Sequence, residues 1–401
     1  MKKNQRGFTL VELLVVMTIF VIVIMITADA FKTIITQATK IFRSEESNIE
    51  GVVGLEMMRH DLQQGGYGLF TQTSPVAYSE AASTPASTYN ETVTTNAPRA
   101  FVAGQNLAAV NETTSGSTYG VLEATDYLAI KGTSVARSGA SQRWTYLQNV
   151  PGTGVVPNQW PSAAENFGLH ERVVLMQRRV TPTNNTLTLI PSGTNHNFDY
   201  ESTAFASYST NTDSYIVYGV ADSGTPRMPF NRTDYFVARP ADTTRIPEMC
   251  APNSGVLYKT TINQTNGNLT YLPILDCVAD MQIVFGWDLK NGSSAGTDGL
   301  IDTYSNADGT ARSGPATQAE VQAALLSPAA IRNNLKMIKV YILAQNGRRD
   351  PSYTSPATIR VGGQAELALT KDFDIATAGW QNYRWKLYQI VVRPKNLTSN
   401  Q

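Results

Sequence analysis

The N-terminal segment constrains this chain more than any other feature. A short basic leader that holds Lys2, Lys3 and Arg6 precedes an apolar run over residues 8–27, which is almost wholly Leu, Val, Ile, Met and Phe. A helix of this length covers the roughly 30 Å hydrocarbon core of a bilayer. Positive charge tends to stay on the cytoplasmic side of a membrane. The sequence therefore predicts a single-pass membrane helix with a cytoplasmic N-terminus and an exported remainder.

The helix is predicted to continue well beyond the membrane. Apolar residues recur at a spacing of three and four after residue 27, no proline interrupts residues 8–64, and Gly51 is the first glycine after the leader. Gly65 and Gly66 are then expected to end the helix, because glycine readily adopts a positive φ. This pattern predicts a spine helix over residues 8–66, roughly 80 Å long. One alternative stays open, because Ala28-Asp29-Ala30 also fits a secretory cleavage site that would release a chain starting at Phe31.

The motif Gly7-Phe8-Thr9-Leu10-Val11-Glu12 resembles the prepilin leader of type IV pilins and of type II secretion pseudopilins. The resemblance implies that residues 1–7 are a leader peptide, that a prepilin peptidase cuts after Gly7, and that Phe8 becomes methylated. It also implies that Glu12 pairs with the methylated amine of a neighbouring subunit. A carboxylate near the bilayer centre costs about 2.5–3.5 kcal/mol, so Glu12 needs either such a partner or an escape to the headgroups.

A second resemblance comes from three stretches, residues 55–67, 334–345 and 383–397, which look like parts of PilW-like minor pilins and the related J-type pseudopilins. It implies an α+β fold, in which the long N-terminal spine helix packs on a large, mostly antiparallel β-rich head over residues 121–401. The implied function is assembly of a type IV pilus, in a priming or tip complex, rather than catalysis. The implied partners are other minor and major pilins, the prepilin peptidase and the inner-membrane assembly platform. The chain would sit in the inner membrane first and in the pilus at the cell surface later.

Two other functions stay open at this point. The same leader and architecture occur in minor pseudopilins of type II secretion systems. Alternatively, the segment over residues 67–120, which is crowded with Ser, Thr and Asn, is a set of long loops or exposed edge strands that binds surfaces as a pilus-tip adhesin.

The remaining sequence is rich in β-strand patterns. Alternation with a period of two predicts strands on which one face is buried. A capping-box pattern at Thr317 and Glu320, followed by Ser327-Pro328, predicts helical turns between two of the strands. The predicted strands cover residues 126–130, 172–180, 214–220, 235–238, 256–261, 269–275, 281–287, 336–343 and 383–392.

The two cysteines, Cys250 and Cys277, both fall in the exported part. Oxidising conditions favour a disulfide between them, and the alternative is a pair of buried free thiols. Their number and spacing suit no zinc site.

A loop over residues 287–302 is the candidate ligand site. Asp288, Asp298 and Asp302 could gather around calcium, which prefers oxygen ligands. The first half of the loop does not match an EF-hand, and the alternative is a plain polar turn. No other cofactor is expected.

The charge balance and the histidines argue against other functions. Lys plus Arg equal Asp plus Glu at 32 each, and no basic cluster interleaved with aromatics occurs, so a nucleic-acid partner has little electrostatic support. Residues 292–296 match the nucleophile-elbow pattern, with Ser294 as the nucleophile. His60, His170 and His196 all precede Ser294, however, which excludes the hydrolase order of serine, acid and histidine. The sequence predicts a protein that is not an enzyme.

Overall fold

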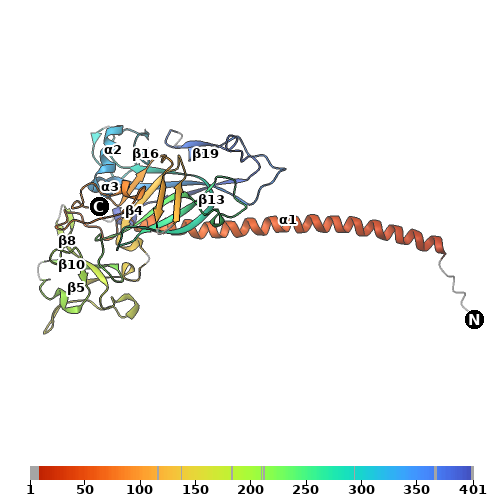
Figure 1. The fold of residues 1–401 in the computed structure, drawn as a ribbon. Coiled ribbons are helices and arrows are strands. Elements are labelled where there is room, and N and C mark those ends of the chain that lie inside the picture. The colour runs from red at the N-terminus through yellow and green to blue at the C-terminus, as the bar shows by residue number, and fades with distance from the viewer. Residues whose placement is uncertain are drawn as a thin grey trace, which may run out of the picture.

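The computed structural model describes residues 9–114, 117–136, 138–181, 184–208, 210, 213–292, 294–364 and 368–398. A long helix, α1, projects from a β-rich head, and the head surrounds only the C-terminal part of that helix (Figure 1). A second, smaller group of strands lies at the end of the head farthest from the N-terminus. This is the α+β architecture that the sequence predicts.

The spine helix α1 spans Leu10–Gln64 as one continuous helix of 55 residues. Thr9 caps its start, and Gly65 follows its end with an N–H that donates to the carbonyl of Asp61. The next residue, Gly66, has a φ of +87°, a conformation that glycine adopts without a steric penalty. The observed helix lies within the predicted range of residues 8–66, of which residue 8 is outside the described residues.

An antiparallel sheet of 11 strands forms the centre of the head. Its main path is β1-β4-β11-β12-β13-β16-β17, with β18 beside β13, β21 beside β18, β3 beside β11 and β2 beside β3. The strands are β1 (Phe101–Gly104), β2 (Asn111–Thr114), β3 (Ser117–Val121), β4 (Tyr127–Gly132), β11 (Asn231–Pro240), β12 (Gly255–Ile262), β13 (Leu269–Trp287), β16 (Thr303–Asn306), β17 (Arg312–Ser313), β18 (Leu335–Gln345) and β21 (Trp385–Val392).

The second sheet has six strands in the order β6-β5-β10-β7-β8, with β9 beside β7. Along β7, Val174 and Met176 belong to the main core, whereas Val173 and Leu175 belong to a separate cluster with Phe205. One face of this sheet therefore packs on the main head and the other on its own loops. The strands are β5 (Trp144–Val150), β6 (Gly154–Pro157), β7 (Arg172–Thr181), β8 (Asn184–Ile190), β9 (Phe198–Asp199) and β10 (Ser214–Ala221).

Small elements complete the head. The capping box at Thr317 and Glu320 starts a helix, and Ser327 caps the next helix, both as predicted. The helices are α2 (Gln318–Leu326), α3 (Pro328–Asn334) and α4 (Lys395–Thr398), and two short hairpins pair β14 (Lys290–Asn291) with β15 (Ser294–Ala295) and β19 (Thr358–Val361) with β20 (Lys371–Asp374). Single 3₁₀ turns lie at Ala86–Tyr89, Thr133–Val135, Ala140–Gln142, Ala163–Glu165, Ser202–Phe205 and Thr243–Arg245.

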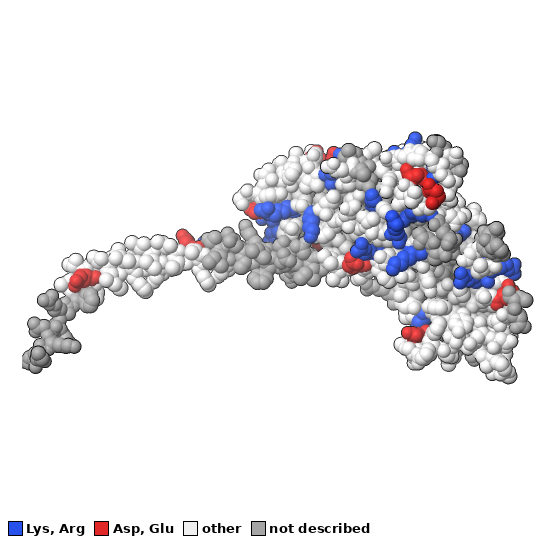
Figure 2. Space-filling view, turned by 180° about the vertical axis from the view of Figure 1, so that it is seen from behind, with Lys and Arg blue, Asp and Glu red and all other residues white. Residues whose placement is uncertain are grey.

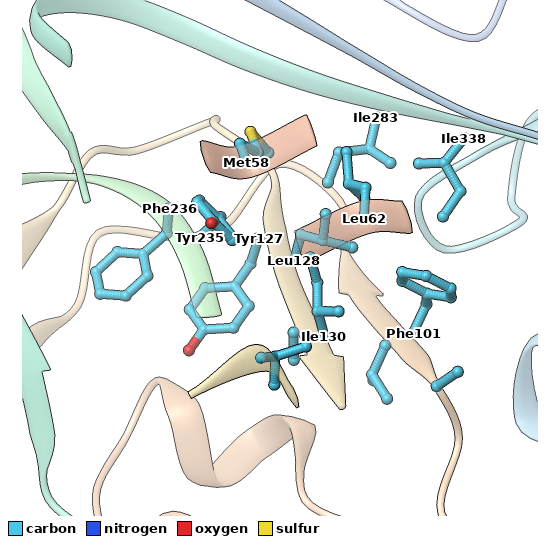
Figure 3. Close-up of a cluster of buried hydrophobic side chains, with 14 of the residues drawn as sticks. Met58, Leu62, Phe101, Tyr127, Leu128, Ile130, Tyr235, Phe236, Ile283 and Ile338 are labelled. Atoms are coloured by element: carbon cyan, nitrogen blue, oxygen red, sulfur yellow. The ribbon is translucent and has the colours of Figure 1, made fainter. Parts of the chain in front are cut away.

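The C-terminal turns of α1 pack on one face of the large sheet. Leu55, Met58 and Leu62 are buried in the main core. Figure 3 shows Met58 and Leu62 beside side chains of the strands. At Gly54 the helix crosses β13 so closely that a Cβ atom would lie 2.1 Å from the carbonyl oxygen of Ile274. A side chain at this position would force the helix away from the sheet.

Residues 71–100 cover the opposite face of the same sheet. The ring of Tyr89 stacks on Tyr127 with centroids 4.3 Å apart, and the ring of Tyr78 packs edge-on against Phe230 at 5.2 Å. Residues 71–100 contain no strand and are not an exposed insert, whereas residues 101–120 of the same predicted loop segment contribute to β1, β2 and β3 of the sheet. The head therefore has three layers, with α1, the sheet and residues 71–100 in order.

One strand differs from its prediction. Residues 269–275 and 281–287 were expected as two strands, but they form the single strand β13. Pro273 lacks an N–H, and the register shifts around Cys277, which has a φ of +54°. The bend at these residues interrupts the alternation that a sequence pattern can follow.

Candidate assembly surface

The membrane-proximal half of α1 is an apolar surface that the head leaves bare. Within the described residues, Leu10–Lys32 is the single helical stretch long and apolar enough to cross a membrane, and none of its most apolar window is buried. From Leu10 to Ile26 the large apolar side chains are 48–82% exposed. Figure 2 shows this part of the helix as white, apart from acidic side chains near its two ends. Such a surface needs lipid or other apolar helices around it.

Glu12 folds back onto the start of its own helix. Its Oε2 accepts hydrogen bonds from the Thr9 backbone N–H at 3.0 Å and the Thr9 hydroxyl at 2.9 Å, while the Glu12 N–H donates to the Thr9 hydroxyl oxygen at 3.3 Å. This is a capping box. Within the described residues the other carboxylate oxygen, Oε1, has no donor. A carboxylate can accept about four hydrogen bonds, so Glu12 keeps capacity for a further partner.

The two predicted processing residues, Gly7 and Phe8, lie outside the described residues. Their cleavage and methylation stay predictions. They adjoin Thr9 in the chain, so a mature N-terminus at Phe8 would begin beside the capping box of Glu12.

A buried ion pair fixes α1 to the head. The Asp61 carboxylate lies 2.5 Å from Lys259 Nζ on β12, and it also accepts the Tyr235 hydroxyl at 2.6 Å. Both charged side chains are almost completely buried, at 4% and 3% exposure. Two charges in such a place are tolerated only when they are paired and hydrogen-bonded. The contact therefore sets the position of the helix along the sheet.

A second buried charge network joins residues 71–100 to the sheet. Arg232 makes two hydrogen bonds with Asp234, at 2.8 and 2.7 Å, and one with Glu80 at 2.9 Å. Lys131 contacts Glu80 at 2.9 Å and Glu91 at 2.7 Å. Burial alone would raise the pKa of Glu80, but the positive charges of Lys131 and Arg232 outweigh it and hold that pKa below its usual value. All these carboxylates are therefore matched by cations in the interior.

The disulfide lies at the bend of β13. Cys250 and Cys277 are joined, with Cα atoms 4.9 Å apart and a sequence separation of 27. The bond connects the loop before β12 to the strand that crosses α1 at Ile274. The pairing is the one that the sequence suggests, and it closes the loop that holds all of β12.

The three candidate calcium ligands lie in one loop, where each binds backbone. Asp288 accepts the N–H groups of Asp298 and Gly299 at 3.1 and 2.9 Å, and Asp302 accepts those of Leu289 and Lys290 at 2.7 and 2.9 Å. Lys336 Nζ also lies 3.6 Å from Asp288. These contacts hold the loop closed, and calcium binding there stays a prediction.

A different group has closer ligand atoms. In the part of the chain that the structure describes, His170, Asp199 and Glu201 form the one set of three potential ligands whose atoms lie within 4.8 Å of one another. The group is at least partly exposed, and Arg172 already contacts the Asp199 carboxylate at 3.3 Å. Exposed acidic groups with an arginine partner need no metal.

Two protein-family models match parts of the chain. Residues 2–28 match the prokaryotic N-terminal methylation motif, and residues 234–396 match the type IV pilus-assembly protein W family. Comparisons with curated proteins and with solved structures found no match. The methylation motif and the exposed apolar helix define a prepilin-type protein that is anchored in a membrane. The second match narrows this class, because the two matches together support a PilW-like minor pilin that takes part in type IV pilus assembly.

Proposed function

We propose that this minor pilin enters a priming or tip complex of the pilus, where its α1 packs beside the same helix of other pilins. The observation that supports this role is the bare apolar half of α1, Leu10–Ile26. Lipid covers that surface before assembly, and neighbouring helices replace the lipid in the fibre. The leader side of the helix is cytoplasmic and the head is extracytoplasmic. In this role the chain performs no catalysis.

Glu12 provides the polar contact in this packing. Its Oε2 stays with Thr9, and its Oε1 accepts the N-terminal amine of a neighbour that was processed at Phe8. In an apolar helical bundle a carboxylate and an amine each relieve the desolvation cost of the other. The contact also fixes the axial position of one helix against the next.

The shape of the head supports a position at the end of the fibre. The second sheet extends the head beyond the C-terminal end of α1, on the side away from the N-terminus (Figure 1). A subunit that is bulky at this end obstructs the stacking of another subunit above it. A terminal position avoids this conflict.

Variants of Glu12 test the proposal. We expect Glu12→Gln and Glu12→Ala to be processed and methylated at Phe8, as mass spectrometry of the membrane fraction would show. We also expect at least tenfold less of either variant in sheared surface fibres and in complexes with other minor pilins. Glu56→Gln is the control, because Glu56 is an exposed acidic residue on the same helix.

Normal recovery of Glu12→Ala in fibres would contradict the proposal. A deletion strain separates this role from that of a secretion pseudopilin. Loss of surface fibres supports the pilus role, whereas intact fibres with retained exoproteins support the pseudopilin role.

A further inference from the structure

Three aromatic side chains gather on the second sheet. Trp144 and Tyr146 alternate along β5 and point to the same side, at 41% and 39% exposure. Trp160, from the loop after β6, lies against both, with ring centroids 5.2 Å from Trp144 and 6.0 Å from Tyr146. Most of this sheet face is covered by the main head, but β5 carries these rings past the covered area.

The cluster is held rigidly. The indole N–H of Trp160 donates to the Trp144 carbonyl at 2.9 Å, and the backbone N–H of Trp160 donates to Asn166 Oδ1 at 2.7 Å. Asn166 Nδ2 donates back to the Trp160 carbonyl at 2.9 Å. A ligand that binds here finds the rings already in position, so little conformational entropy is lost on binding.

The rings of Trp144 and Trp160 line a hollow with a polar rim. Its volume is ≈ 560 Å³, and Gln142, Arg143 and Glu165 also line it. This volume falls within the range of about 300–1,000 Å³ that small-molecule sites occupy. In the described part of the chain, the Glu165 carboxylate has no hydrogen bond or ion pair with another side chain. Glu165 is also exposed, so it is available as an acceptor.

We propose that this hollow is a carbohydrate-binding site for a pyranose ring of a surface glycan. One face of an equatorially substituted pyranose carries only C–H groups, which are weakly positive and pack on the negative face of an aromatic ring. The hydroxyl groups around the ring then meet the hydrogen-bonding side chains of the rim. An aromatic wall beside an amide, a guanidinium and a carboxylate supplies both kinds of contact.

The size and place of the patch favour a sugar over a protein partner. A stable protein interface buries about 800 Å² on each side, far more than the exposed parts of Trp144 and Tyr146 supply. The patch also lies at the end of the head that faces away from the membrane anchor (Figure 1). The two family matches leave residues 29–233 uncovered, so the site belongs to the part of the chain that differs from the shared assembly fold.

Titration with defined oligosaccharides tests the proposal. The mature full-length chain is purified in a detergent without a sugar headgroup, because a glycoside detergent would compete. Cellotriose, chitotriose and maltotriose are added up to 10 mM, with mannitol as a hydroxyl-rich control that lacks a ring. We expect at least one trisaccharide to change the tryptophan fluorescence saturably and to give saturation-transfer NMR signals from its ring C–H protons, whereas mannitol gives neither.

Variants then locate the site. We expect Trp144→Ala and Trp160→Ala to weaken binding at least tenfold, and Trp144→Phe to retain most of it. Leu169→Ala is the matched control, because Leu169 is an apolar residue on the same part of the head with 75% exposure. Equal binding by Trp144→Ala and the unchanged chain would overturn the proposal. Absence of binding to all three trisaccharides, or loss of pilin partners instead of sugar binding in the Trp144 variant, would also overturn it. These outcomes do not depend on the Glu12 results, because no fibre is involved.

Discussion

Asp61 on the spine helix and Lys259 on β12 form an ion pair of 2.5 Å inside the head, 198 positions apart in sequence, and Tyr235 completes the set with a hydrogen bond of 2.6 Å. The pair lies beyond the membrane segment, where α1 crosses the sheet. Any force that acts on the membrane end of α1 reaches the head through this region, together with the close contact at Gly54.

We expect Asp61→Asn to lower the free energy of unfolding by about 3–5 kcal/mol, because Lys259 would stay buried without its partner charge. Urea denaturation of the detergent-solubilised chain measures this. The control is Glu56→Gln, which breaks only the exposed 3.3 Å pair with Arg59 and should change stability by less than about 1 kcal/mol. The double variant Asp61→Asn, Lys259→Met should regain part of the free energy of unfolding that Asp61→Asn alone loses. A strictly additive double variant would show that the two charges do not act as a pair.

Glu80 tests whether residues 71–100 are part of the folded core. We expect Glu80→Gln to cost about 3 kcal/mol or more, because it removes the negative charge shared by Lys131 and Arg232. Glu123→Gln, at an exposed position, should be nearly neutral. An adhesive insert on an otherwise complete head would instead tolerate Glu80→Gln and lose only attachment.

The disulfide can be tested with a reductant. Reducing Cys250–Cys277, or replacing both residues by Ala, should lower the free energy of unfolding by about 3–4 kcal/mol for a loop of this length in the chain-entropy model. The chain has no other cysteine, so the double variant should not respond to dithiothreitol at all. A denaturation midpoint that is the same with and without reductant in the unchanged chain would contradict the expectation.

Asp280 should give the head a measurable pH dependence. Burial raises the pKa of Asp280 to about 6, although Lys371 at 3.3 Å partly opposes the rise. Burial also raises the pKa of the neighbouring Asp126. Because the folded chain holds the Asp280 proton more tightly than the unfolded chain, the stabilising contribution is complete below about pH 4 and is lost as the pH rises to about 6. A pKa shift of this size corresponds to a change of about 3 kcal/mol in the free energy of unfolding.

The measurement is the difference in unfolding free energy between the unchanged chain and Asp280→Asn from pH 4 to pH 7. The unchanged chain should lose stability relative to the variant across this range. A difference that is constant with pH would show that Asp280 does not titrate there.

The loop of Asp288, Asp298 and Asp302 allows a test with and without calcium. We expect Asp302→Ala to lower the free energy of unfolding by about 1–3 kcal/mol in EDTA, because the N–H groups of Leu289 and Lys290 lose their acceptor. If calcium also binds, millimolar calcium raises the midpoint of the unchanged chain but not of Asp302→Ala. An Asp302→Ala variant as stable as the unchanged chain in EDTA would contradict the capping role.

Local signals made much of this fold predictable. Helix periodicity and paired glycines located α1, and the pattern at Thr317 and Glu320 located α2, since each depends on residues a few positions apart. The interior of residues 71–100 could not be predicted in the same way. Glu80 meets Arg232 across 152 positions, and no local pattern shows that a Ser- and Thr-rich segment carries matched buried charges.

Some of the candidate sites were also predictable from the sequence, and others were not. The positions of Cys250 and Cys277 indicated their pairing, since the chain has no other cysteine. The aromatic patch had one available signal, the alternation of Trp144 and Tyr146, but Trp160 joins them only through the path of the loop after β6. The capping bond between Thr9 and Glu12 was not predicted, although it joins residues only three positions apart, whereas the partner of Asp61 lies on a distant strand.

The three-layer head has a consequence for the timing of export. Its middle layer is completed only by late parts of the chain, because β13 pairs with β18 and β18 pairs with β21, which ends at Val392. In the proposed topology, the C-terminal part of α1 and residues 71–100 leave the membrane first and must wait for that sheet. Contacts between such distant segments form slowly. In that topology, a subunit whose translocation stops before β12 leaves Asp61 without Lys259, and only a chain exported through β21 offers a finished sheet for fibre assembly.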